Sequence, residues 1–407
     1  MGSEKDKPRI FYGWWVVFAF ALIELFFGAT YTSGFTAFVN PIAAELGWTY
    51  GAISLSSTVR GFESGLLSPF IGVFADKLGP RILFFWGVII AGFGFWFFST
   101  IHSLWSFYAS SLVTALGFSL AGHVVALTAV ARWFKTKTTL AMGFVLTGLA
   151  AGGLLVPLVV WLVDRFGWRQ ALVGFAFGSW ILGIPLALLV KNPNDASKQK
   201  GSGTSAPREE LKGATTREVL RMRSFWLLST AVFFAGVSGV ALMVHQIPYL
   251  VSIGFTRQTA GVMASVFAIS SITGRVLFGW LGDVFEKRWC FVAAALAEGV
   301  GVIVFVSARS LWQVIFALVP LGVGYGGTIP LRPALQVELF GRRAFGTVQG
   351  LLLVFMTLGS MIAPPFAGWM FDLVKSYRPA FLVLSVCAFM AIPTILLVRK
   401  ETTANST

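Results

Sequence analysis

The chain has 407 residues, of which 56% are hydrophobic and 12% are charged, with a mean hydropathy of +0.79. Soluble domains carry about 25% charged residues, so this composition excludes an ordinary soluble protein and indicates a membrane protein. The net charge of +14 does not indicate a nucleic-acid partner, because most Lys and Arg residues fall on one predicted side of the apolar runs, which is the positive-inside pattern.

Apolar runs long enough to cross a bilayer recur along the whole chain. A spanning helix needs about 20 apolar residues. The first run follows a short polar N-terminus and lacks a small-residue cleavage site, so we interpret it as a retained span. The positive-inside pattern places its N-terminus in the cytoplasm. The C-terminus is then cytoplasmic too. The runs predict twelve transmembrane helices, near residues 12–39, 49–75, 82–101, 104–131, 138–163, 169–190, 224–252, 257–282, 289–308, 311–338, 345–371 and 379–398.

A polar segment at residues 191–222 interrupts this series. Its middle part, residues 198–207, is rich in Gly and Ser, which is typical of a flexible linker, and a short surface helix is predicted to begin at Thr215. We expect an all-α membrane protein with an N-terminal six-helix bundle over 1–190, a cytoplasmic linker and a C-terminal six-helix bundle over 223–407.

The two halves repeat one pattern. The Gly-x-x-x-Asp motif at Gly72–Asp76 recurs 207 residues later at Gly279–Asp283, and Gly143 falls on Gly350 at the same offset. This periodicity indicates an internal duplication. Parallel repeats of this kind are found in transporters whose two halves are related by an axis along the membrane normal.

Arg275 lies inside an apolar segment, not at its polar edge. A cation at membrane depth costs roughly 2.5–3.5 kcal/mol on insertion scales, so it needs a partner, a water-filled cavity or a function. Its guanidinium group can bind a carboxylate with two hydrogen bonds. The alternative is a structural arginine that bonds to helix ends or to a buried acid.

Other ionisable residues lie at similar depth. Arg60 can pair with Glu63 on one helix face or with Glu24 on the first span, and such a pair would need no further function. In the functional alternative, Glu24, Glu63 or His123 carries a proton.

Two more charged residues receive structural interpretations. Glu298 is expected to be peripheral. We expect Arg332 to reach the membrane surface or to pair near Glu338 rather than to contact a substrate.

Four stretches resemble a known family. Residues 72–81, Gly-Val-Phe-Ala-Asp-Lys-Leu-Gly-Pro-Arg, resemble the loop signature of the major facilitator superfamily between spans two and three. Residues 133–152 begin Trp-Phe-Lys-Thr-Lys and continue with Leu-Ala-Met-Gly and further glycines, which is similar to the monocarboxylate transporter signature. Residues 12–16 are similar to that family's first-span motif, and residues 220–226 to the entry into span seven of bacterial relatives, including the oxalate–formate antiporter. The resemblance covers residues 11–399.

This resemblance implies a twelve-helix major facilitator fold and a secondary transporter, not an enzyme. It implies transport of a small, lactate-like monocarboxylate by alternating access, with proton symport. Arg275 occupies the position of the family's substrate-binding arginine, and Ser271 stands where some members hold an acid that helps to couple protons. The candidate substrate-binding residues are Arg275, Ser271, Tyr31, His123, Arg60, Tyr325 and Gln349. The candidate gate residues, expected to bond to neighbouring helix ends when the inner side is shut, are Asp76, Lys77, Arg81, Asp283 and Arg288.

Other functions stay open at this point. An anion exchanger like the oxalate–formate antiporter is expected to use a second cation in span eleven for a dicarboxylate. Residues 345–371 contain no Lys or Arg, so a monocarboxylate is favoured, although Arg60 could supply a second charge. A drug exporter would not depend on Arg275, and a sensor that kept the fold would transport nothing.

The sequence also suggests a setting for the protein. No nucleotide-binding lysine motif, metal-ligand spacing or cofactor motif is present. We expect a functional monomer in a bacterial inner membrane whose partners are an organic anion, a proton and lipid, and nothing in the sequence bears on an accessory subunit.

Overall fold

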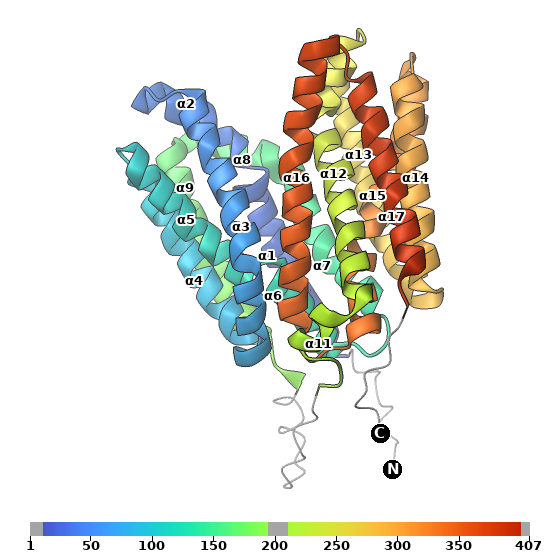
Figure 1. The fold of residues 1–407 in the computed structure, drawn as a ribbon. Coiled ribbons are helices and arrows are strands. Elements are labelled where there is room, and N and C mark those ends of the chain that lie inside the picture. Colours follow the sequence, from blue (N-terminus) through green and yellow to red (C-terminus); the bar gives the residue numbers. More distant parts are fainter. Residues whose placement is uncertain (1–10, 194–210, 400–407) are drawn as a thin grey trace, which may run out of the picture.

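The structure is a computed structural model that describes residues 11–193 and 211–399, which are almost entirely helical (Figure 1). The side chain of Arg60 and those of several neighbours between residues 50 and 64 lie outside this description. The N-terminal helices are α1 (Gly13–Phe27), η1 (Gly28–Thr32), α2 (Thr36–Leu46), α3 (Tyr50–Leu78), α4 (Pro80–Ser99), α5 (Leu104–Ala121), α6 (His123–Trp133), α7 (Thr138–Gly152), η2 (Gly153–Leu155), α8 (Val156–Phe166) and α9 (Trp168–Leu189). The C-terminal helices are α11 (Thr216–Arg221), α12 (Arg223–Ser252), α13 (Arg257–Val284), α14 (Lys287–Ser307), α15 (Leu311–Phe340), α16 (Phe345–Val374) and α17 (Arg378–Leu397).

These helices account for the twelve predicted spans. Within the described residues, eleven helical segments are long and apolar enough to cross a membrane. The remaining predicted span is α3, whose 29 residues extend for about 43 Å but include charged side chains such as Glu63 and Asp76. The predicted all-α fold is confirmed.

Three of the spans are interrupted, which the sequence analysis did not predict. A π-helical turn separates α1 from α2, a 3-10 turn separates α7 from α8, and the extended backbone of Gly122 separates α5 from α6. The first span is also longer than predicted, because α2 continues to Leu46. A Cβ atom at Gly122 would lie 2.5 Å from the carbonyl oxygen of Phe118, so this break requires glycine.

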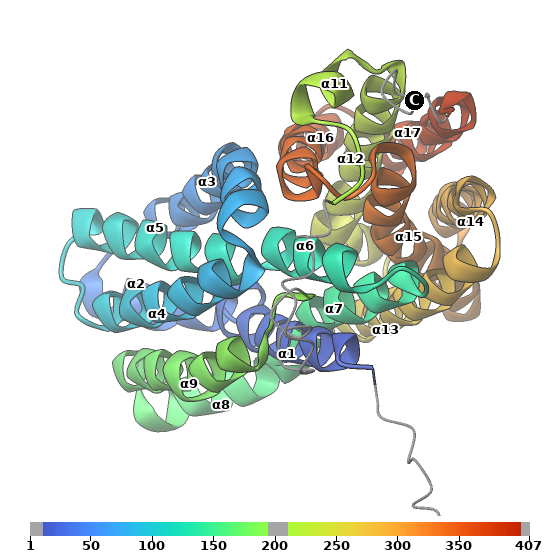
Figure 2. The same ribbon diagram turned by 90° about the horizontal axis from the view of Figure 1, so that it is seen from below.

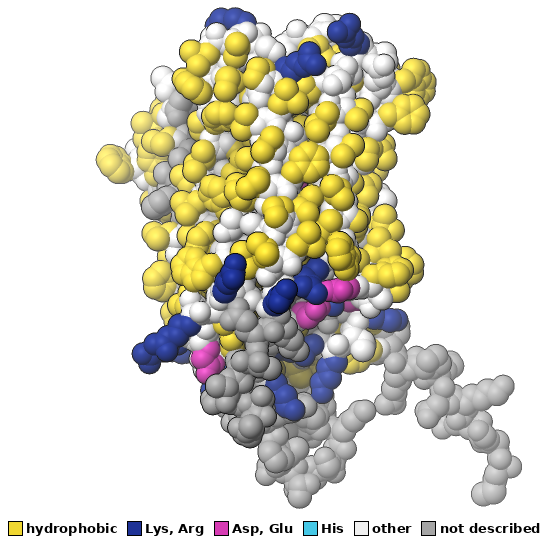
Figure 3. All heavy atoms as spheres, turned by 45° about the vertical axis from the view of Figure 1, so that its right-hand side comes forward, with side chains coloured by type: hydrophobic (Ala, Val, Ile, Leu, Met, Phe, Trp, Pro, Cys, Tyr) yellow, Lys and Arg dark blue, Asp and Glu magenta, His cyan; other side chains and the backbone are white. Residues whose placement is uncertain are grey.

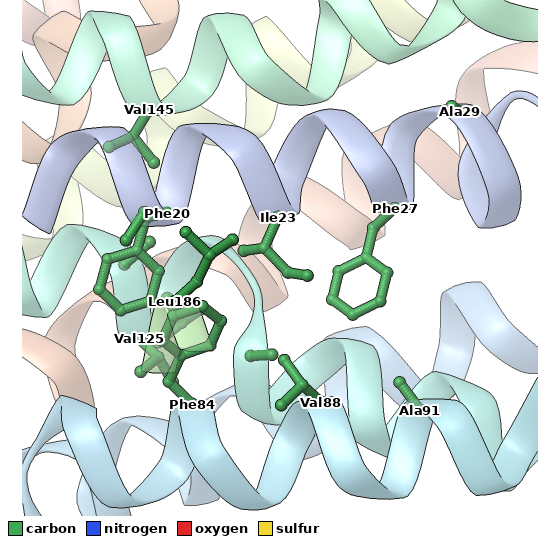
Figure 4. Close-up of a cluster of buried hydrophobic side chains, with 14 of the residues drawn as sticks. Phe20, Ile23, Phe27, Ala29, Phe84, Val88, Ala91, Val125, Val145 and Leu186 are labelled. Atoms are coloured by element: carbon green, nitrogen blue, oxygen red, sulfur yellow. The ribbon is translucent and has the colours of Figure 1, made fainter. Parts of the chain in front are cut away.

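The N-terminal helices α1 to α9 pack around one apolar core. α4 packs against α5 and α9, and α1 packs against α7. Figure 4 shows this core between α1 and α4, where the rings of Phe20 and Phe84 stack with their centroids 4.5 Å apart and Ile23, Val88 and Leu186 fill the space beside them. We call this unit the N-terminal bundle.

The C-terminal helices α12 to α17 form a second unit, the C-terminal bundle. α15 packs against α13 and α14, while α12 packs against α16 and α17. Its apolar interior divides into two clusters, one around Phe291 and Leu331 and the other around Phe305 and Phe381. The predicted limits of the domains stay predictions.

The bundles meet mainly where α3 packs against α16 and α7 against α13, and α7 also contacts α15 and α6 contacts α16. The bundles approach each other at the end that carries α11 and diverge toward the opposite end (Figure 1), and the view from the α11 end shows α6 and α7 beside the C-terminal helices (Figure 2). We call the end with α11 the closed end.

Glycines allow the backbones of the two bundles to touch. A Cβ atom at Gly72 on α3 would lie 2.0 Å from the carbonyl oxygen of Gly346 on α16, and one at Gly143 on α7 would lie 2.6 Å from that of Arg275 on α13. The pairs Gly72 with Gly279 and Gly143 with Gly350, found from the 207-residue repeat, therefore lie at these two interfaces.

Hydrophobic side chains cover the middle of the face shown in Figure 3, and Lys and Arg side chains gather toward its ends. This distribution suits a protein that crosses a bilayer.

The short helix predicted to begin at Thr215 is confirmed as α11. The Thr215 hydroxyl accepts a hydrogen bond from the backbone N–H of Glu218, and the Glu218 carboxylate accepts one from the N–H of Thr215, which is a capping box. The linker residues 198–207 lie outside the described residues.

Candidate functional site

Arg275 lies where α13 meets α7 of the other bundle. Its Nη1 donates a hydrogen bond of 2.5 Å to the carbonyl oxygen of Leu146, while its Nε has no partner. The side chain is half-buried. Among the ion pairs of the described residues none involves Arg275. This guanidinium group is therefore held by one backbone carbonyl and keeps most of its donors for another acceptor.

Glu24 on α1 is the acid that faces this arginine. Its side chain is fully buried, and neither carboxylate oxygen has a hydrogen-bond partner. It lies close enough to Arg275 for an electrostatic interaction without forming an ion pair. Because α1 packs against α7 through the close contact of Gly148 with the carbonyl of Ala21, Glu24 approaches the interface from the N-terminal bundle.

Tyr325 and Ser271 complete this group from the C-terminal bundle. Tyr325 on α15 lies within electrostatic reach of Arg275 and of Arg332, and its ring stacks on Phe267 with centroids 5.7 Å apart. Ser271 is buried, and its hydroxyl oxygen has no partner. Arg275 thus has Glu24 of α1 and Tyr325 of α15 within electrostatic reach, and Ser271 lies about one helical turn before it on α13.

The other candidates lie mainly at the interface of α3 with α16. His123, the first residue of α6, lines a cavity of about 10 Å³ together with Ser68 of α3 and Leu353 of α16, which is about the space of one water molecule. Glu63 is buried and both of its oxygens lack a partner. The Oε1 atom of Gln349 on α16 is also buried without a partner.

Two candidates need separate mention. Tyr31 lies in the π-helical turn with its ring centroid 5.1 Å from that of Phe118. The side chain of Arg60 is outside the described residues, so its predicted pairs with Glu24 and Glu63 stay predictions.

The expectations for Arg332 and Glu298 were wrong. Arg332 is only 6% exposed and bonds to the Thr328 hydroxyl, while Glu338 pairs with Lys287 at 3.0 Å. Arg332 shares a helix face with Tyr325, seven residues earlier, and this face points into the bundle.

Glu298 is 4% exposed and accepts a hydrogen bond from the Ser238 hydroxyl on α12. It is not peripheral, because its side of α14 packs on α15, where a Cβ atom at Gly324 would lie 2.5 Å from the Glu298 nitrogen. The glycines beside it, Gly299 and Gly301, were the signal in the sequence for a packed helix face.

The aspartates of the two loop motifs bind the first residues of helices in the opposite bundle. Asp76 accepts hydrogen bonds from the backbone nitrogens of Gly346 and Thr347, at 2.9 and 2.8 Å, and from the Thr347 hydroxyl at 2.8 Å. Asp283 accepts them from the nitrogens of Thr139 and Leu140, both at 2.9 Å. Carboxylates are favourable at helix N-termini, where unpaired N–H groups gather.

These two contacts are copies of one another. The offset of 207 residues that relates Asp76 to Asp283 also relates Thr139 to Gly346 and Leu140 to Thr347. The duplication inferred from the sequence thus extends to the contacts that join the halves.

The remaining gate candidates do not bridge the bundles in this structure. Arg288 pairs with Glu286 at 2.5 Å and bonds to the Val398 carbonyl, all within the C-terminal bundle. Lys77 is exposed and Arg81 is half-buried. Their part in gating stays a prediction.

The sequence analysis missed Arg342, which lies between α15 and α16. Its guanidinium group donates to the carbonyl oxygens of Ala131 and Phe134, at 2.7 and 3.0 Å, at the end of α6. A cation is favourable at a helix C-terminus. The signal was available in the repeat, because Arg342 lies 207 residues after Lys135 in the basic cluster that follows α6.

Comparison with known proteins places the chain in a family. The sequence model of the Major Facilitator Superfamily matches residues 18–256 and again residues 230–407. The chain belongs to the Major Facilitator Superfamily. Within that superfamily, monocarboxylate transporter 12 of Mus musculus is 27% identical over 360 residues, which cover 80% of this chain and 72% of the relative. The oxalate:formate antiporter of Oxalobacter formigenes is 26% identical over 394 residues, covering 93% and 89%.

A solved structure agrees on the fold. The fucose:proton symporter of E. coli superposes with a TM-score of 0.73 at 16% identity, covering 95% of this chain and 98% of that one. The predicted membership of the monocarboxylate transporter-like group of the superfamily and the major facilitator fold are both confirmed.

Proposed function

We propose that this member of the superfamily transports a small monocarboxylate such as lactate together with a proton, by alternating access. The observation that carries the proposal is that Arg275 and Glu24, which belong to different bundles, lie within electrostatic reach of each other without forming an ion pair, and that both Glu24 oxygens lack a hydrogen-bond partner. The names of the relatives, which concern monocarboxylates, oxalate and formate, support the substrate class.

The pair gives a reason for coupling an anion to a proton. An ionised carboxylate in a buried, unpaired setting carries a penalty of several kcal/mol. When Glu24 holds a proton, Arg275 is available to a substrate carboxylate, and the loaded site gains no net charge. When substrate and proton leave together, the ionised Glu24 can neutralise Arg275, so the empty protein can return.

The contacts of Asp76 and Asp283 support alternating access. Both aspartates hold helix ends of the opposite bundle at the closed end, so opening this end requires breaking both contacts. With the termini in the cytoplasm, as we propose, the closed end is the inner end of a bacterial inner-membrane protein, and this conformation faces outward.

The test is uptake of labelled L-lactate into proteoliposomes under an inward proton gradient. Arg275→Gln is expected to abolish uptake. Arg257→Gln, a matched change at an exposed arginine on the same helix, is expected to leave uptake unchanged.

Glu24→Gln separates coupling from binding, because glutamine imitates the protonated acid but cannot release a proton. It is expected to stop gradient-driven accumulation while exchange between internal and external lactate continues. Accumulation that persists in Glu24→Gln removes Glu24 from the coupling role. Wild-type activity only in vesicles preloaded with anion would establish exchange instead of symport.

A further inference from the structure

Arg332 is a buried cation with weak partners. It is 6% exposed, its Nη2 donates to the Thr328 hydroxyl at 3.0 Å, and its Nη1 approaches the Met356 sulfur at 3.3 Å. Its Nε has no partner. A thioether sulfur is a weak acceptor, so this guanidinium group is far from satisfied by neutral neighbours alone.

The acid that interacts with Arg332 does not form an ion pair with it. Glu298 interacts electrostatically with Arg332, but its carboxylate accepts a hydrogen bond from the Ser238 hydroxyl and forms no ion pair with the arginine. Among the ion pairs found in the described ranges, none involves Arg332. A buried cation without a paired anion is costly, and a ligand anion would remove that cost.

Arg332 also lies beside the site already described. Tyr325 lies within electrostatic reach of both arginines, and the two arginines interact with each other. α13 and α15 run side by side with Gly274 against the carbonyl of Val323 and Gly327 against the ring of Phe278. Thr328, whose hydroxyl bonds to the Arg332 guanidinium group, therefore lies about one helical turn, or ~5 Å along the helix axis, from the backbone of Arg275.

We propose that Arg332 is a second anion-binding side chain of the Arg275 site, and that it accepts the second carboxylate of a three- or four-carbon dicarboxylate. The inference rests on the proposed function of Arg275 as the first carboxylate ligand. A monocarboxylate then uses Arg275 alone. A dicarboxylate bridges the two guanidinium groups and replaces the sulfur of Met356 as the acceptor of Arg332.

The test is inhibition of labelled L-lactate uptake by malonate and succinate, with propionate as the monocarboxylate reference. In Arg332→Gln, the inhibition constants of malonate and succinate are expected to rise at least tenfold, while those of lactate and propionate stay within threefold. Arg257→Gln is the matched control. Equal weakening of both classes, or unchanged inhibition by dicarboxylates, would overturn the proposal.

A second variant gives a change of the opposite sign. Glu298→Gln keeps an oxygen for Ser238 but removes the carboxylate that interacts electrostatically with Arg332, so inhibition by malonate and succinate is expected to strengthen at least threefold. A purely structural role of Glu298 predicts loss of protein or no selective change, and either result counts against the proposal even if Arg332→Gln fails to fold.

The two proposals fail differently. Lactate uptake without any inhibition by dicarboxylates in the wild type would overturn the second arginine's role and leave the proposed function intact. Absence of lactate uptake would remove the proposed function. In that case thermal stabilisation of the purified protein by malonate, measured with and without Arg332→Gln, still decides whether this arginine binds the anion.

Discussion

Replacing Asp76 by asparagine should weaken the closed end of the molecule. The carboxylate of Asp76 accepts three hydrogen bonds from α16, and its side chain is 11% exposed. Asparagine keeps one acceptor oxygen and loses the negative charge that favours a helix N-terminus.

The size of the effect follows from these contacts. Hydrogen bonds to charged groups contribute about 1.5–3 kcal/mol each, so losing the charge and at least one acceptor should shift the closed-to-open equilibrium by about 3 kcal/mol, or roughly 100-fold. Asp283 accepts two hydrogen bonds, so Asp283→Asn should shift it less. Because the two sites share no partner, the double variant should approach the sum.

Distances between spin labels at Ile82 and Trp289 measure this shift. These residues are exposed, lie at the first turns of α4 and α14, and belong to different bundles. Cys290 and Cys387 must first be replaced. The variants should add a population with a longer distance, in the order Asp76→Asn, then the double variant. A distance distribution that stays the same in the double variant would refute the gate role of both aspartates.

Two further predictions concern packing and pH. Gly143→Ala should destabilise the protein and slow transport, because its Cβ atom would meet the Arg275 carbonyl. Gly174→Ala, whose Cβ atom would have nothing within 4 Å, should instead stabilise the protein by about 0.5–1 kcal/mol. Thermal unfolding and lactate uptake are measured for both variants, and equal behaviour of the two contradicts the prediction. The hydrogen bonds from Thr215 hold the pKa of Glu218 below its ordinary value of 4.5, so the capping box contributes stability above that value and loses it as the pH falls through the lowered pKa. In the wild type, the protection of the α11 amides from hydrogen exchange should therefore increase as the pH rises through this range. In Glu218→Gln the increase should be smaller, and identical pH profiles of the two proteins would contradict this prediction.

The repeat and the helices could be predicted from the sequence because both depend on local patterns. Apolar length located the spans, and the 207-residue offset linked Gly143 to Gly350 before any contact was known. The burial of Arg332 could not be predicted in this way, since a snorkelling and a buried arginine differ only in which neighbours the helix face meets. Those neighbours, such as Met356 on α16 and Glu298 on α14, come from packing between helices.

The equivalent contacts of Asp76 and Asp283 hold the two bundles together at the closed end, and their equivalence has an evolutionary consequence. In a twofold-symmetric pair of identical six-helix chains, one aspartate would make the same contact twice, so a single substitution would alter both. In a single chain the two aspartates are separate positions that can change independently. Their contacts already differ, since Thr347 adds a hydroxyl bond to Asp76 where the equivalent Leu140 has none to offer Asp283. Selection can therefore change the strength of one of these contacts while the other stays unchanged.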